Sequence, residues 1–216
     1  IKFLDIAKNN GLVVMVTDYC FTKPFVDNSY KNCDKKGYIS FVAADRELNK
    51  IPKYPAKPNK VNNLDIVLLK DARNFLYLIN PNNFSTKKSF LNAIKKTDFD
   101  VVIIDLFYND IALTADDINL LKNKNTGGKR LVICYMSIGE AEDYRYYWHS
   151  VWKKNKPEWL LSENPNWKGN YKVCYWNKNW QKIIYGTDDS YLDKIIKSGF
   201  DGVYLDIVDA FEYFEN

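Results

Sequence analysis

Short apolar runs recur along this chain, and polar residues follow each run. The runs are rich in Val, Ile and Leu and are short, which is typical of buried strands. Segments with a helical spacing of apolar residues lie between them. The sequence therefore predicts alternating strands and helices, as in a parallel sheet covered on both faces. The predicted strands occupy residues 13–16, 38–44, 75–79, 101–104, 131–136 and 203–205.

The predicted helices have recognisable ends. Ser85 precedes the helical pattern at 87–97, and Thr114 precedes the pattern at 115–124, as N-cap residues do. A first helical pattern runs from Ile1 to a stop at Gly11. Because a domain rarely begins inside a helix, we expect the natural protein to extend upstream, where a signal peptide could lie. Glycine before the next strand marks other helix ends, at Gly37, Gly128 and Gly199.

The polar residues at the strand ends favour a (β/α) barrel, because functional residues gather at that rim. A doubly wound open sheet shares the pattern, but no Gly-rich turn follows a strand here. Successive strand-end residues are 27, 35, 25 and 35 apart, and the last interval is 66. The excess length predicts a long loop on the catalytic side, while 51–63 predicts a surface connection. The strand-end residues are Asp18, Asp45, Asn80, Asp105, Glu140 and Asp206.

Composition excludes several classes of protein. The 216 residues are 46% hydrophobic, which is enough to bury a core and excludes disorder, and no apolar run reaches membrane-spanning length. The net charge of +4 comes from scattered lysines, which indicates solvated helix faces and not a nucleic-acid surface. The lone His149 and four separated cysteines form no zinc pattern, so we predict neither metal nor cofactor.

The rim residues suggest chemistry on sugars. Paired carboxylates are what glycosidic cleavage requires. Six acidic residues are predicted near one mouth: Asp18, Asp45, Asp105, Glu140, Asp206 and Asp209. A strand-end Asp can also be a helix cap or an ion-pair partner. All six tryptophans fall between Trp148 and Trp180, within the predicted long loop. Flat aromatic rings stack on sugar faces, so this cluster predicts a sugar groove, although some rings would pack the loop onto the barrel.

Four stretches of the sequence resemble the TIM-barrel glycoside hydrolases of the endo-α-1,4-polygalactosaminidase family (family 114). The resemblance implies an α/β fold, a (β/α)8 TIM barrel, of which six βα units are visible. It covers about half of the chain in the family's order. The stretches are VVIIDLF, RLVICYMSIGEAEDYRYYW, PEWLLSENPNWKGNYKVCYWNKNWQ and SGFDGVYLDIVDAFEYFE.

The N-terminal half resembles the same family in a displaced order. VMVTDYC and GYISFVAADREL resemble its last two strands, yet here they precede FLYLINP, which resembles its first strand. The resemblance therefore implies a circularly permuted member. We expect residues 1–216 to form a single barrel domain that lacks two βα units, which would lie upstream of Ile1.

The resemblance also implies roles for individual residues. Asp206, in the YLD motif, is the expected catalytic carboxylate, the nucleophile or its equivalent. The family's proton-donating Glu lies on the sixth strand, which this sequence does not display. Arg145 either orients substrate or is a structural ion-pair partner. The expected substrate-binding residues are Asp105, Glu140, Asp209, Asp18, Arg145, Tyr135, Trp148, Trp167, Tyr175 and Trp176.

The implied function is hydrolysis of an α-1,4-linked, partly deacetylated galactosaminyl polysaccharide, outside the cell or in the periplasm. The cationic amines of such a polymer would suit an acidic rim. Two alternatives stay open at this point: a catalytically inactive polysaccharide-binding barrel, and a glycosidase of other linkage specificity. Neither a nucleic acid nor a membrane span is expected.

Overall fold

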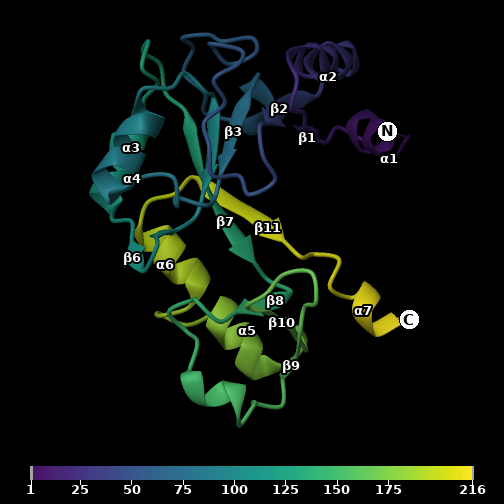
Figure 1. Cartoon of the computed structure of the whole chain (residues 1–216), viewed down its shortest axis with the longest axis vertical. Coiled ribbons are helices and arrows are strands. Elements are labelled where there is room, and N and C mark those ends of the chain that lie inside the picture. The colour runs from purple at the N-terminus through teal and green to yellow at the C-terminus, as the bar shows by residue number, and fades with distance from the viewer. Residues whose placement is uncertain (1, 216) are drawn as a thin grey trace. The chain divides into compact units, whose positions relative to one another are not determined.

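The computed structural model describes residues 2–215, and their strands and helices alternate for much of the chain (Figure 1). The helices are α1 (Lys2–Asn9), α2 (Lys23–Lys36), α3 (Lys87–Lys95), α4 (Ala115–Leu121), α5 (Lys178–Ile184), α6 (Tyr191–Lys197) and α7 (Glu212–Glu215), with 3₁₀ turns η1 (Leu69–Asp71) and η2 (Ser150–Lys153). The strands are β1 (Met15–Tyr19), β2 (Ile39–Ala43), β3 (Phe75–Leu78), β4 (Val101–Ile104), β5 (Phe107–Tyr108), β6 (Ile111–Ala112), β7 (Leu131–Ser137), β8 (Glu140–Glu142), β9 (Leu160–Glu163), β10 (Asn170–Val173) and β11 (Gly202–Asp206).

The chain divides into two compact units. The first contains Ile1–Asp105 and Asp116–Ile133, and the second contains Leu106–Ala115 and Cys134–Asn216. Strand β7 therefore begins in the first unit and ends in the second.

The first unit contains the predicted parallel strands. β1 pairs in parallel with β2, and β3 pairs in parallel with β4, with Phe75 opposite Val101. A parallel bridge between Ser40 and Asn74 places β2 beside β3. β2, β3 and β4 are buried along their whole length, as is typical of apolar strands in a parallel sheet. The prediction of an α/β fold with a parallel sheet is confirmed.

Most predicted strand bounds are close to the observed ones, and β1 is the exception. β1 extends to Tyr19, so Asp18 lies within the strand, opposite Val42, and does not follow its end. Polar residues that end a run of apolar residues can continue a strand as long as the backbone of a neighbour pairs with them. The prediction that Thr17–Tyr19 ends this strand is wrong.

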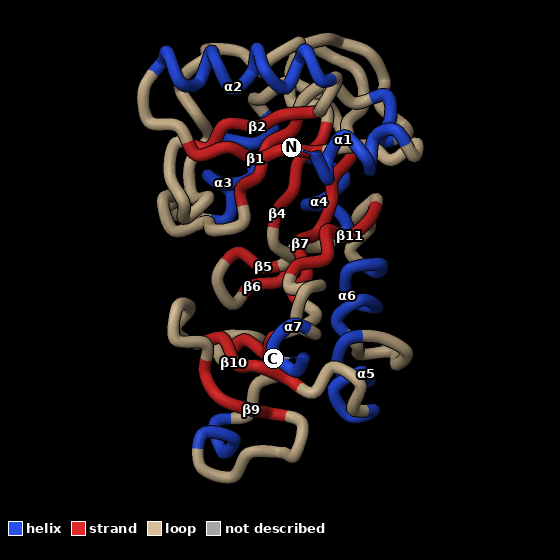
Figure 2. The backbone as a smooth tube through the Cα atoms, turned by 90° about the vertical axis from the view of Figure 1, so that its right-hand side faces the viewer, coloured by secondary structure: helices blue, strands red, loops and turns tan. Residues whose placement is uncertain are grey.

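The helices of the first unit show how local sequence sets their bounds. α2 ends at Gly37, whose φ of 66° is a left-handed conformation that glycine adopts easily. α3 is capped by Thr86 and not by Ser85, because the Thr86 hydroxyl accepts from the Ser89 backbone N–H at 3.0 Å. Gly128 lies in a turn well after α4 ends, so the prediction that it ends a helix is wrong. Figure 2 shows α2 as a single continuous helix over β1 and β2.

One lysine of the first unit is buried, contrary to the expectation that the lysines are solvated. Lys124 Nζ lies 2.9 Å from Asp100 Oδ1, and neither side chain has any exposed surface. Asn62 contributes to both partners, since its amide donates to Asp100 and its carbonyl oxygen accepts from Lys124. The backbone N–H of Arg73 also donates to Asp100 Oδ2. These contacts tie Asn62 and Arg73, in the connection between β2 and β3, to the residue before β4.

The tryptophan stretch of the second unit is not a long loop, as predicted, but contains a three-stranded antiparallel sheet in the order β8-β10-β9. The strands are only three or four residues long, and apolar and polar residues are mixed within them. Such strands carry little periodicity, which is why the pattern of the sequence misses them. β11 and β7 are neighbours in a separate sheet.

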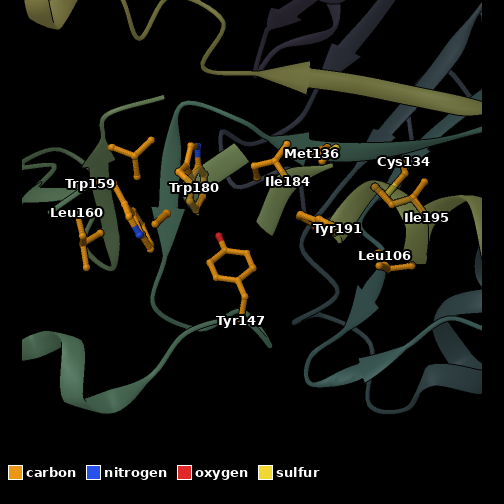
Figure 3. Packing of buried hydrophobic residues seen from close by; sticks show 12 residues of the cluster. Leu106, Cys134, Met136, Tyr147, Trp159, Leu160, Trp180, Ile184, Tyr191 and Ile195 are labelled. Carbon is orange, nitrogen blue, oxygen red and sulfur yellow. The ribbon is translucent and has the colours of Figure 1, made fainter. Parts of the chain in front are cut away.

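An aromatic core holds the second unit together (Figure 3). Trp159 and Trp180 are buried, with ring centroids 5.1 Å apart, and Tyr147 meets the Trp180 ring edge-on at 5.8 Å. Tyr191 and Ile195 of α6 belong to the same cluster. Part of the tryptophan cluster is therefore core, which is the alternative reading of these aromatic residues.

Other features of the chain agree with the sequence. All four cysteines are free, and Cys134 is fully buried. α1 ends before Gly11, whose φ is 83°, and Ile1, which was included in the predicted helix, lies outside the described residues. Between residues 2 and 215, no helix has both the length and the apolar character that crossing a membrane requires.

Candidate active site

Asp206 is the last residue of β11, and its side chain is half-buried. The Tyr135 hydroxyl, from β7, donates to Asp206 Oδ2 at 2.6 Å. The Ile138 N–H donates to the Asp206 backbone carbonyl at 3.1 Å. Asp206 is therefore fixed through both its side chain and its main chain.

The turn that follows Asp206 is strained. Ile207 has a φ of 57°, which is rare for a β-branched residue. Gly139 lies so close that a Cβ there would be 2.3 Å from the Ile207 carbonyl oxygen and 2.5 Å from the Ala210 Cβ. Strain of this kind persists only where the surroundings enforce it, and it often accompanies functional residues. A glycine is therefore required at position 139, because the backbone at Ile207 comes too close to leave room for a side chain.

Glu140 has no exposed surface, although it was predicted to bind substrate. Its Oε1 lies 2.6 Å from Lys172 Nζ and accepts from Asn164 Nδ2 at 2.8 Å. The register of β8 against β10 places Lys172 directly opposite Glu140. Within the described part of the chain, Oε2 is buried and has no hydrogen-bond partner.

Arg145 is buried in the second unit and forms an ion pair with Glu142, Nε to Oε2 at 2.6 Å. Its guanidinium also lies between 5.2 and 5.9 Å from the ring centroids of Phe107, Tyr144 and Tyr191. These surroundings agree with the interpretation of Arg145 as an ion-pair partner. Its predicted role in orienting substrate stays a prediction.

The remaining acidic residues differ in their surroundings. Asp18 accepts from the Ser29 hydroxyl at 2.6 Å, and Asp105 is buried directly after β4. Asp45 forms an ion pair with Lys50 and accepts from the Glu47 N–H at 2.7 Å, which lowers the pKa of its carboxyl group. Asp209 is exposed in the turn before α7. Asp45 therefore has a structural role, as an ion-pair partner and as the acceptor of a backbone N–H in the turn after β2.

The aromatic residues predicted to bind sugar divide by exposure. Trp167, Tyr175 and Trp176 are 44%, 39% and 51% exposed, so their rings are available to a ligand. Trp148 is half-buried and packs on Trp152 and Tyr171 instead. The exposed rings are the better candidates for stacking on sugar faces.

The second unit also contains an apolar cavity of about 450 Å³. Leu205 and Ile207, on either side of Asp206, line it together with Tyr175 and Trp180.

Burial and the carboxylate of Asp189 raise the pKa of Tyr146 to about 12, so that phenol keeps its proton at neutral pH. Between residues 2 and 215, no group of three or more His, Cys, Asp or Glu side chains has an arrangement that could hold a metal ion.

Sequence reasoning missed several residues of this site: Gly139, Lys172, Asn164 and Ile207. Gly139 carries a signal, since a glycine between a strand and Glu140 suggests close backbone approach. Lys172 carries none, because its pairing with Glu140 depends on the register of two strands 30 residues apart.

Carboxylates at or directly after parallel strands, in an α/β fold with exposed aromatic rings, are typical of enzymes that act on sugars. The model of glycoside-hydrolase family GH114 matches residues 52–216. Since that match covers most of the sequence, the chain belongs to glycoside-hydrolase family GH114.

Curated relatives are themselves uncharacterized proteins. The chain is 38% identical over 179 residues to MJ1477 of Methanocaldococcus jannaschii, 39% over 127 residues to a protein of Deinococcus radiodurans and 52% over 81 residues to one of Thermotoga maritima. These alignments cover 80%, 58% and 38% of this chain. The chain spans 49%, 38% and 24% of the length of these relatives.

Two solved structures are also similar. Ega3 of Aspergillus fumigatus, in complex with galactosamine, is 30% identical with a TM-score of 0.40. The glycoside hydrolase domain of PelA from Pseudomonas aeruginosa is 18% identical with a TM-score of 0.37. In both cases the similarity covers 53% of this chain and 39% of the other.

Proposed function

We propose that this chain belongs to an enzyme that cleaves α-1,4-linked, galactosamine-containing polysaccharide, and that Asp206 is a catalytic carboxylate. The observation that carries the proposal is the position of Asp206. It lies at the carboxyl end of β11, half-buried, with one oxygen bound by Tyr135, inside the segment that matches the family. Catalytic groups of parallel α/β enzymes occupy such strand ends.

Glycosidic cleavage needs a second carboxyl group, which protonates the leaving oxygen or activates water. By resemblance to the family, we propose that this group lies on a strand other than the six recognised in the sequence. Separations of about 5–5.5 Å between the two carboxyl groups go with retention of configuration, and about 6.5–9.5 Å with inversion. Asp206 would be the nucleophile in the first case and the base in the second.

The proposed substrate-binding groups are exposed aromatic rings and charged or polar side chains. Trp167, Tyr175 and Trp176 would stack on sugar faces, because their rings are exposed. Acidic side chains would attract the cationic amines of a partly deacetylated polymer. Asp105, Glu140, Asp209 and Asp18 would supply this negative charge, while Arg145 and Trp148 keep a proposed role in contacting the sugar. On the family resemblance alone, we place the activity outside the cell or in the periplasm.

We also propose that the fold is a circularly permuted barrel. The parallel bridge between Ser40 and Asn74 supports this proposal, since β2 and β3 resemble the family's last and first strands. Those two strands are neighbours when a barrel closes. The family match begins at residue 52, after β1 and β2, as a displaced N-terminal segment would require.

The substitution Asp206→Asn tests the proposal. It removes the ionisable group with little change in shape, so cleavage of the polymer should fall by roughly 10³-fold or more while binding persists. The control is Asp189→Asn, because Asp189 is 95% exposed in the same unit. Chain length of the products is measured by size-exclusion chromatography. Full activity of the Asp206→Asn variant would refute the assignment.

A catalytically inactive polysaccharide-binding protein is the second candidate. It is favoured by the contacts of Glu140 and Asp45, whose carboxylates already form ion pairs within the protein. This candidate predicts that the wild-type protein binds the polymer without shortening it. A glycosidase of other linkage specificity would instead release products from a different polysaccharide in the same assay.

A further inference from the structure

Tyr135 and Asp206 form a short side-chain hydrogen bond between neighbouring strands of the candidate site. Tyr135 is buried on β7, and its hydroxyl donates to Asp206 Oδ2 at 2.6 Å. Its ring lies nearly parallel to that of Tyr204, with an interplanar angle of 20° and centroids 6.3 Å apart. Tyr204 precedes Asp206 by two residues on β11, the neighbour of β7 in the sheet. The phenol is therefore held by the same strand that carries the carboxylate.

This contact makes the two carboxylate oxygens of Asp206 different from each other. Oδ2 accepts the Tyr135 proton, whereas no hydrogen bond to Oδ1 comes from residues 2–215. Asp206 is half-buried, so part of its surface remains accessible. A hydrogen bond to one oxygen fixes the rotation of the carboxylate about its terminal bond, which is otherwise broad. Oδ1 is thus left in a fixed direction.

We propose that Tyr135 is a positioning residue that binds Oδ2 and reserves Oδ1 of Asp206 for the reaction. This inference rests on the proposed function and replaces the substrate-binding role that the family resemblance gives to Tyr135. A phenol has one proton to donate, and Tyr135 donates it to Asp206 and not to a sugar hydroxyl. Its contribution to catalysis then passes through the orientation of the carboxylate.

The substitution Tyr135→Phe separates the two roles. Phenylalanine keeps the ring and its packing on Tyr204 but removes the donated proton. A positioning role predicts that kcat falls by about 10- to 100-fold while KM stays within about twofold. A substrate-binding role predicts instead that KM rises by about 10- to 100-fold while kcat stays within about twofold. The thermal unfolding midpoint is measured on each variant to verify that it folds.

Tyr147→Phe is the matched control, since Tyr147 is also a buried tyrosine of the second unit. Its hydroxyl accepts from the Glu142 N–H at 3.0 Å, and its other described contacts are with rings remote in sequence from Asp206. It should lower the unfolding midpoint without changing kcat. A similar fall in kcat in both variants would show that the loss of any buried tyrosine hydroxyl lowers kcat, and it would overturn the inference.

Binding to the Asp206→Asn protein supplies an independent measurement. The dissociation constant for a galactosamine oligosaccharide should be the same, within about twofold, with and without Tyr135→Phe. A tenfold weaker binding in the double variant would instead assign Tyr135 to the substrate. If the wild-type protein cleaves the polymer and Tyr135→Phe retains its kcat, the inference alone fails. If the wild-type protein does not cleave, the proposed function fails and the inference falls with it.

Discussion

At the scale of single residues, Lys124 shows that the pattern of charges along a sequence does not predict which charged side chains are buried. It lies in a polar stretch, KNKNTGGK, that predicts exposure, yet its ammonium group is buried against Asp100. A buried charge is tolerated only with a partner and further hydrogen bonds. Asn62 provides those bonds from a position 62 residues away. No local pattern reports a contact over that separation.

The substitution Lys124→Met tests this contact. It keeps the length of the side chain but leaves the Asp100 carboxylate buried without its counter-charge, so the free energy of unfolding should fall by about 3–5 kcal/mol. The control, Lys88→Met on the exposed face of α3, should change it by less than about 0.5 kcal/mol. Urea unfolding followed by circular dichroism measures both. Equal stability of the two variants would contradict a structural role for the Lys124–Asp100 pair.

The candidate site was partly predictable residue by residue. Asp206 follows from its place at the end of an apolar strand and from the YLD motif, and the structure places it at the end of β11. Arg145 had two interpretations in the sequence, and its partner Glu142 becomes evident only from the tight turn between them. Glu140 is paired with Lys172 across two strands, a register that the sequence does not report.

At the scale of helices and strands, the elements with a clear pattern of apolar residues were the ones that the sequence predicted. The apolar strands β2, β3, β4, β7 and β11 lie within one or two residues of their predicted bounds, because continuous apolar runs leave a clear pattern in the sequence. The sheet β8-β10-β9 was predicted as a loop, because its strands are short and carry mixed side chains. The tryptophans of this stretch serve two purposes that composition alone does not separate. Trp159 and Trp180 form the core, while Trp167 and Trp176 are exposed.

The junction between β7 and β8 supports a prediction about the turn after Asp206. Gly139→Ala adds a methyl group where the Ile207 carbonyl oxygen and the Ala210 Cβ leave no space. The turn at 206–207 must move, so the turnover of the polymer should fall by roughly 10²-fold, and stability by about 1–3 kcal/mol. Activity assays and thermal unfolding measure the two effects.

Gly186→Ala is the control for this prediction. A Cβ at Gly186 meets no atom within 4 Å, but its φ of 85° is unfavourable for alanine. The variant should lose about 1 kcal/mol of stability and keep its turnover. If the two variants lose activity in proportion to their stability, the effect of Gly139 is not specific to the Asp206 turn.

At the scale of the whole molecule, the segment outside the family match poses the main structural question. Residues 1–51 precede the matched region, yet β2 lies beside β3 through the Ser40–Asn74 bridge and is fully buried. Phe41 packs on Phe75 and Phe99, with ring centroids 5.6 and 6.3 Å apart. The resemblance to the family implies the displaced order of these strands, but it does not report which strands become neighbours in this chain. The bridge between Ser40 and Asn74 shows that β2 and β3 are neighbours.

Deletion of residues 1–51 tests whether this segment is integral to the fold. Removing β1 and β2 would expose the edge of β3 and the buried Phe75, and an exposed apolar edge strand favours aggregation. The shortened protein should therefore be insoluble or unfold without a cooperative transition. Deletion of residues 1–11 is the control, since α1 contains no buried residue and its loss should leave a cooperative transition. Gel filtration and thermal unfolding distinguish the outcomes. A soluble, cooperatively folding product of the larger deletion would show that β1 and β2 are an appendage, and it would remove the main support for a permuted barrel.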